Sequence, residues 1–187
     1  MLEKFNIKQI VFISLMTAFL FVVDFALGSW INSITTIPGM SSFANTITNV
    51  FVLTLAILIM RKFGGPTIIY GLYGIIALPT TLAGGAPGFW PKIPLCIISG
   101  LLFELPIILF NFKKKGFILS LPLFFIIGYG LYLPVYWLMG APEFASMAKL
   151  FVPGVIVLIL LGYVGMWLAF KLYNKIKDKS IIKQIAD

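Results

Sequence analysis

Long runs of apolar residues alternate along this chain with short segments that carry nearly all of its positive charge. The runs cover about residues 9–30, 43–60, 64–83, 95–112, 117–139 and 150–170. A helix that rises 1.5 Å per residue needs about 20 residues to cross about 30 Å of hydrocarbon, and each run approaches that length. The pattern predicts an all-α integral membrane protein whose six spans form one domain over residues 1–187.

The positive charges predict the orientation of these spans. Of the fourteen Lys and Arg residues, only Lys92 and Lys149 lie outside four clusters at residues 4–8, 61–62, 113–115 and 171–183. Lys and Arg beside membrane spans are retained on the cytoplasmic side. We therefore expect both termini and the basic tail 171–187 to be cytoplasmic in a multi-pass protein of the plasma membrane. Segments 31–42, 84–94 and 140–148 would then be outside loops.

Composition narrows the class of protein further. The chain is 60% hydrophobic and 11% charged, whereas soluble domains carry about 25% charged residues. It has no histidine, which removes Ser-His-Asp and Cys-His catalysis and the commonest ligand for transition metals. We expect neither an enzyme nor a metal site. The net charge of +8 lies at helix ends, where anionic lipid headgroups attract it, so we expect no nucleic-acid partner.

The third run differs from the others in its glycine content and in Pro79. We expect a short or broken helix there. The following segment, Gly84–Pro94 (GGAPGFWPKIP), is dense in turn signals around an aromatic pair. Such a segment is typical of an ordered loop and suggests a lid.

Two acids, Asp24 and Glu104, interrupt the apolar runs. An ionised carboxylate in hydrocarbon costs about 2.5–3.5 kcal/mol, so such residues face a cavity, a partner or the bundle interior. Both are candidates for binding a solute. Equally, each acid is protonated or pairs with a buried polar group such as Asn45, Asn49 or a tyrosine.

Asn45 and Asn49 are four residues apart near the start of the second run, so they share one helix face. They are suited to hydrogen-bond a polar ligand that enters from outside. The alternative is a pair of interhelical hydrogen bonds, worth about 0.6 kcal/mol each on average.

Trp90 and Lys92 lie in the second outside loop. Lys92 suits an anionic group of a ligand or a lipid headgroup. Trp90 suits a planar ring that stacks on it, or the interfacial aromatic belt.

Tyr129, Tyr132 and Tyr136 recur at spacings of three and four, which places them on one stripe of the fifth span. Tyr70 and Tyr73 are contributed by the third span. A tyrosine presents an apolar ring and a hydroxyl that needs a partner, so the stripe suits an amphipathic pocket. Packing between helices is the alternative.

Ser14 and Ala18 form a small-xxx-small pair near the start of the first span, a pattern that allows another helix to approach closely.

The six short spans, the small-residue pair and the long outside loops resemble the substrate-binding S component of energy-coupling factor (ECF) vitamin transporters. In that family an Ala-x-x-x-Ala motif of span 1 docks on a transmembrane coupling subunit, and Ser14 and Ala18 occupy the matching positions. The stretch Trp90–Glu104 also looks distantly like the hydroxymethylpyrimidine/thiamine type. Its Gly-Leu-Gly-Ala-Glu run is here Gly100–Glu104 (GLLFE), which differs at two positions. The histidine of the cobalt and nickel branch is missing.

This resemblance implies high-affinity capture of a small vitamin-like solute in the outer half of the bundle. The chain has no G-x-x-x-x-G-K-[ST] stretch, so ATP would be used by partner ATPase subunits and not by this chain. The alternative function is a stand-alone proton-coupled carrier or small channel that uses Asp24 and Glu104. The charge of the solute stays open, because the two loop lysines favour an anion and the two acids favour a cation.

Overall fold

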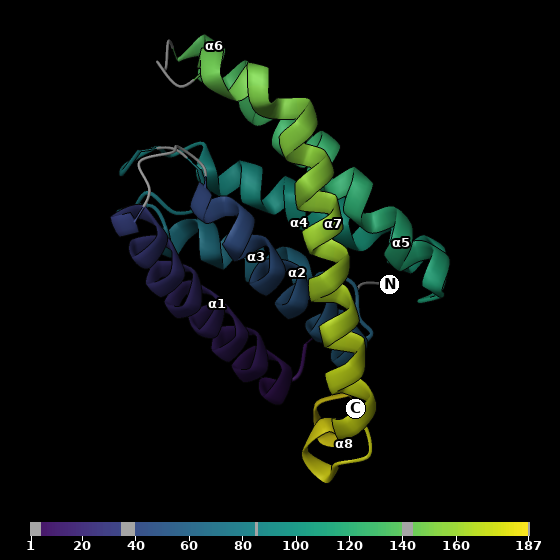
Figure 1. Ribbon diagram of the computed structural model, residues 1–187. Helices are drawn as coiled ribbons and strands as arrows, with labels where there is room; N and C mark the ends of the chain where they lie inside the picture. The colour runs from purple at the N-terminus through teal and green to yellow at the C-terminus, as the bar shows by residue number, and fades with distance from the viewer. Residues whose placement is uncertain (1–4, 35–39, 85, 140–143, 187) are drawn as a thin grey trace.

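The computed structural model describes residues 5–34, 40–84, 86–139 and 144–186, and all regular secondary structure in these ranges is helical (Figure 1). In chain order the elements are α1 (Ile7–Ile34), α2 (Met40–Met60), α3 (Gly65–Ile76), α4 (Lys92–Leu109), α5 (Lys114–Pro122), the π-helix η1 (Leu123–Gly128), α6 (Tyr132–Leu138), α7 (Phe144–Ile176) and α8 (Ser180–Ala186).

Five helical segments of the described chain are long and apolar enough to cross a membrane. They are Ile7–Ile31, Ser41–Met60, Lys92–Leu109, Lys114–Leu138 and Phe151–Ile176. The fourth of them combines α5, η1 and α6, and its change of helix type begins directly after Pro122, which lacks the N–H of a regular turn. The predicted all-α, multi-pass membrane protein is therefore confirmed at the level of class.

The third run forms only α3, whose 12 residues rise about 18 Å and cannot cross about 30 Å of hydrocarbon. Gly64 precedes it at φ 101° and Pro66 stands in its first turn, a common helix start. The helix ends at Ile76, three residues before Pro79, and residues 77–79 form a turn. The expected short helix is thus confirmed, although it stops earlier than residue 83.

The bounds of three predicted segments were wrong. The outside loop 140–148 was expected to be irregular, but α7 begins at Phe144, and residues 140–143 lie outside the described residues. The tail was expected to leave the helix at residue 171, but α7 continues to Ile176. Lysines in the last turn of a helix interact favourably with its dipole, and Lys175 occupies that turn. The loop 31–42 is also shorter, because α1 reaches Ile34 and α2 begins at Met40.

Helix α2 lies at the centre of the bundle and packs against α1, α3 and α7, while α3 packs on α4, and α4 on α5 and η1. Figure 1 shows α7 crossing in front of α2. Glycines allow the closest approaches. A Cβ on Gly165 of α7 would lie 2.4 Å from the Ile47 carbonyl oxygen, and one on Gly100 of α4 would lie 2.8 Å from the Thr67 Cα. Small residues at such contacts are typical of helices that associate in membranes.

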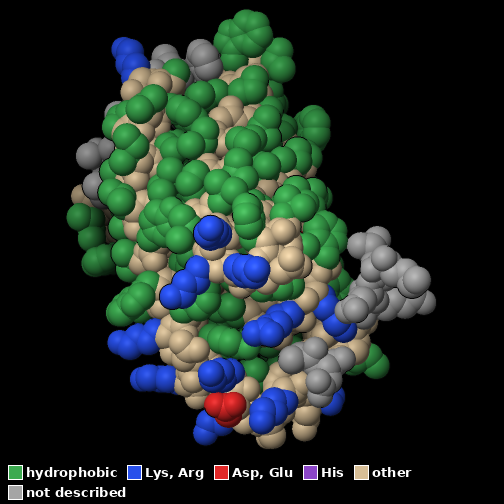
Figure 2. Space-filling view, turned by 90° about the vertical axis from the view of Figure 1, so that its right-hand side faces the viewer, with side chains coloured by type: hydrophobic (Ala, Val, Ile, Leu, Met, Phe, Trp, Pro, Cys, Tyr) green, Lys and Arg blue, Asp and Glu red, His purple; other side chains and the backbone are tan. Residues whose placement is uncertain are grey.

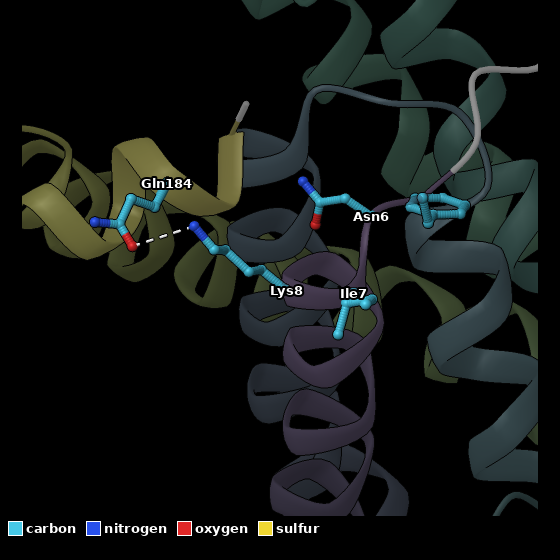
Figure 3. A pocket seen from close by; sticks show the side chains of 5 residues that line it. Asn6, Ile7, Lys8 and Gln184 are labelled. Carbon is cyan, nitrogen blue, oxygen red and sulfur yellow. Dashed lines mark hydrogen bonds between the residues drawn. The ribbon is translucent and has the colours of Figure 1, made fainter.

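The start and the end of the described chain lie together. Gln9 Nε2 donates to the Ile185 carbonyl at 2.9 Å, and Lys8 Nζ donates to Gln184 Oε1 at 3.3 Å across a shallow pocket (Figure 3). Figure 2 shows most of the Lys and Arg side chains of its face gathered at one end, below a broad apolar surface. We call this the terminal end. We call the opposite end, which carries residues 77–84 and 86–91, the loop end.

We expect Gly165→Ala to destabilise the protein by about 1–3 kcal/mol, because the new methyl group forces α7 away from α2. The measurement is the thermal unfolding midpoint of the purified protein in detergent. Gly154→Ala on the same helix is the matched control, since its nearest neighbour, Phe43 Cζ, is 4.0 Å away. Equal midpoints for the two variants would contradict the close α2–α7 contact.

Candidate functional site

A buried polar cluster joins α1, α2 and α3 in the loop-end half of the bundle. Its members are Asp24, Asn45, Asn49 and Tyr73, and we refer to them as the Asp24 cluster. Asp24 Oδ2 accepts hydrogen bonds from Asn49 Nδ2 and from the Tyr73 hydroxyl, each at 2.8 Å. The Asp24 side chain is 0% exposed, so these bonds form away from solvent and lipid.

The two asparagines hold α2 against α1. Asn49 Nδ2 also donates to the Asn45 carbonyl at 2.7 Å, and Asn45 Nδ2 donates to the Asp24 backbone carbonyl at 3.3 Å. The predicted common face of Asn45 and Asn49 is therefore confirmed, and it points toward α1. The sequence already proposed an asparagine or a tyrosine as a partner for Asp24, and the structure supplies both.

Interhelical bonding does not account for every polar atom of the cluster. Among the buried side-chain atoms of the described residues, Asp24 Oδ1, Asn45 Oδ1 and Asn49 Oδ1 have no hydrogen-bond partner, and neither has Thr54 Oγ1. Three of these four atoms belong to the Asp24 cluster, and all three are acceptors. The cluster is therefore built to receive donors or positive charge, and it offers nothing to an anion.

Glu104 has a different role from the one its sequence position suggested. Both of its carboxylate oxygens reach the start of α3, where Oε1 accepts from the Gly64 backbone N–H at 2.6 Å and Oε2 accepts from Thr67 Oγ1 at 2.8 Å. The first N–H groups of a helix lack partners within it, and the helix dipole favours a negative charge there. Glu104 therefore caps α3 from the neighbouring helix.

Lys92 caps the C-terminal end of α3. Its ammonium group donates to the carbonyl oxygens of Ala77 and Thr80, directly after the last turn of the helix. A positive charge is favourable at this end of a helix, where carbonyl groups lack partners. The side chain is 0% exposed, so in this conformation it contacts neither a lipid headgroup nor an external anion.

The three tyrosines of the predicted stripe do lie along one line. Ring centroids of Tyr129 and Tyr132 are 6.1 Å apart, and those of Tyr132 and Tyr136 are 6.3 Å apart. Phe125 extends this ladder at one end, and Phe89 of the loop stacks on Tyr136 at 5.3 Å at the other. The ladder therefore leads from the bundle interior to the loop.

The segments 77–84 and 86–91 between α3 and α4 contact neighbouring helices. They begin before the predicted loop Gly84–Pro94 and end where α4 begins, so Lys92 belongs to α4 and not to the loop. The Tyr132 hydroxyl donates to the Ala83 carbonyl at 2.9 Å, and Lys92 holds Thr80. Buried Leu82 lies beside Gly28 of α1, where a Cβ would be 3.4 Å from it and 3.8 Å from Asn45 Nδ2. The loop thus covers the loop-end side of the Asp24 cluster.

The remaining candidates lie on the surface. Trp90 is 65% exposed, outside both the cluster and the ladder, which fits the interfacial-belt alternative. Ser14 and Ala18 are exposed on α1, where the Ser14 hydroxyl donates to the Ile10 carbonyl at 3.0 Å.

The sequence also left some residues of these sites unassigned. A tyrosine was proposed as a partner for Asp24, but residue spacing did not indicate that Tyr73 is the one. Gly64 and Thr67 were not considered as partners of Glu104. The Gly-Gly-Pro at residues 64–66 indicates a helix start, and the first N–H groups of a helix need acceptors. This pattern could have pointed to a buried acid such as Glu104 as their acceptor.

Comparisons of the chain with protein-family models, with curated proteins and with solved structures give no significant match. The chemistry of the site therefore rests on its own geometry.

We expect Lys92→Met to lower the stability by about 1–3 kcal/mol, because it leaves buried carbonyl acceptors without a donor. Thermal unfolding in detergent measures the effect, and Lys149→Met, at an exposed position of α7, is the matched control. A Lys92→Met protein as stable as this control would show that the ammonium is not needed as a cap.

Proposed function

We propose that this chain is the substrate-capture subunit of an ATP-driven ECF-type importer in the plasma membrane. In this proposal α3 and its loop form the third of six passes, and the terminal end faces the cytoplasm. The chain binds a small vitamin-like solute from outside, in the outer half of the bundle. The observation that carries the proposal is the buried Asp24 cluster, whose acceptor oxygens lack partners, together with an aromatic ladder that meets the loop at Ala83 and Phe89.

The two parts of this region suit one solute. In the proposed complex, the unpartnered acceptor oxygens of Asp24, Asn45 and Asn49 would bind N–H or O–H groups of the solute, and the Tyr129 and Tyr132 rings would contact its aromatic or heterocyclic body. This division into a few polar groups and an apolar wall is typical of small-molecule sites. The acceptors favour a solute that is a donor or a cation at its polar end.

The exposed side of α1 supports docking of a transmembrane coupling subunit. Ser14 and Ala18 lie on this side, next to the exposed side chains of Leu15 and Phe19. Small residues let a partner helix approach closely. ATP hydrolysis by partner subunits would then drive release of the solute.

We expect Ala18→Trp to abolish co-purification of the coupling and ATPase subunits and to reduce ATP-dependent uptake at least about tenfold, since a bulky ring separates the helices by more than a packed contact allows. Solute binding by the isolated subunit should stay unchanged. Ile156→Trp, on an exposed position of α7, is the control. Loss of partners with Ile156→Trp alone would place the docking face on α7.

The experiment that tests the proposal as a whole is native mass spectrometry of gently purified protein, followed by release and identification of any bound small molecule. A heterocyclic solute at near-stoichiometric level supports a capture subunit. Protein without such a solute, whose unfolding midpoint does not change with a panel of micronutrients, contradicts it.

A proton-coupled carrier is the second candidate, and the unpartnered Oδ1 of buried Asp24 favours it. Glu104 contributes less to this candidate than the sequence suggested, because both of its oxygens are bonded at the start of α3. For a carrier we expect uptake into proteoliposomes without any ATPase subunit, driven by a pH gradient. Asp24→Asn should remove the dependence on the gradient, whereas a capture subunit shows no uptake at all under these conditions.

A further inference from the structure

We infer that the Asp24 cluster binds one alkali-metal cation, of the class of Na⁺ or K⁺, through Asp24 Oδ1 and the amide oxygens of Asn45 and Asn49. A solute at the Asp24 cluster would then contact the bound ion in place of these three oxygens. The inference does not rest on the proposed function, because an ion that stabilises the bundle is compatible with a capture subunit and with a carrier.

The first argument is the charge of the cluster. Asp24 is fully buried, and its side-chain partners among the described residues are Asn49 and Tyr73, with no Lys or Arg among them. A buried charge needs a paired charge of opposite sign. One carboxylate and two neutral amides are balanced by a single positive charge, whereas a divalent ion would leave one charge uncompensated.

The second argument is that the hydrogen bonds fit the ionised carboxylate. Asp24 Oδ2 accepts from two donors, Asn49 Nδ2 and the Tyr73 hydroxyl. Donors directed at a carboxylate favour its charged form. Burial disfavours a charge on Asp24, and these two donors oppose that effect only in part, so a bound cation would complete the stabilisation of the ionised form.

The third argument concerns the atoms left over. The amide nitrogens of Asn45 and Asn49 are both engaged as donors, which fixes each amide with its oxygen as the free atom. Three acceptors then lack partners, on residues that are already linked to one another by hydrogen bonds. A single water molecule donates only two hydrogen bonds, whereas a hard cation is coordinated by several carboxylate and carbonyl oxygens at once.

The ion would join helices that are distant in sequence. Asp24 belongs to α1 and both asparagines belong to α2, while Tyr73 links the same carboxylate to α3. A ligand that binds only the folded protein raises its stability. Cation binding should therefore appear as thermal stabilisation even when no solute and no partner subunit is present.

The test measures the unfolding midpoint of the purified full chain in detergent at fixed pH. NaCl, KCl or LiCl replaces choline chloride at constant ionic strength. We expect a rise of about 4 °C for each tenfold increase in one of these cations above its dissociation constant. Asp24→Asn should abolish the response and should be at least as stable as the wild type in choline, because it removes the uncompensated charge. Asp178→Asn, at an exposed position, is the matched control and should retain the response.

Direct binding of ²²Na⁺ to the wild-type protein, with K⁺ and Li⁺ as competitors, keeps the test decisive if Asp24→Asn does not fold. Saturable binding of one ²²Na⁺ ion per chain, or displacement of bound ²²Na⁺ by K⁺ or Li⁺, supports the inference. Identical midpoints in all four salts together with no saturable ²²Na⁺ binding would overturn it. None of these measurements requires uptake, so a negative result here leaves the proposed function to its own test.

Discussion

The clamping of α3 by two charged side chains of α4 is the interaction on which the rest of the structure depends. Glu104 bonds the first N–H group at one end of α3, and Lys92 bonds the carbonyl groups that follow the other end. The two side chains are twelve residues apart on one helix, and α3 is twelve residues long, so the antiparallel pair matches in length. The sign of each charge is the one that the dipole of α3 favours.

This clamp determines where the functional groups lie. With both ends of α3 fixed, Tyr73 is held opposite Asp24, and Asp24 in turn orients Asn49. The same Lys92 bond fixes the beginning of the loop, whose later residues meet Tyr132 and Tyr136. The polar cluster and the aromatic ladder thus share one support, although they belong to different helices.

The sequence predicted the membrane class and the approximate spans because apolar length alone determines them. It also singled out Asp24, Asn45, Asn49, Lys92 and Glu104, since polar residues in or beside an apolar run are costly and therefore conspicuous. Their partners could not be predicted in the same way. Lys92 and Glu104 bond to backbone atoms of α3, and backbone groups are present at every residue, so no residue type marks them. The extent of α7 at both ends was missed because helix formation continues beyond the apolar run when the flanking residues also favour it.

The shortness of α3 has a kinetic consequence. If α3 and its loop form a pass, as proposed, about 12 Å of the hydrocarbon depth is left to residues without regular helix, whose N–H and carbonyl groups find no partner in lipid. Thr80 and Ala83 of the loop meet this demand with bonds to Lys92 and Tyr132, which belong to two different spans. To move aside, the loop must release both bonds and expose several backbone groups at once, a rare event. A molecule enclosed beneath it would therefore exchange slowly with the medium, and its residence time would be set by the opening of the loop and not by the strength of its own contacts.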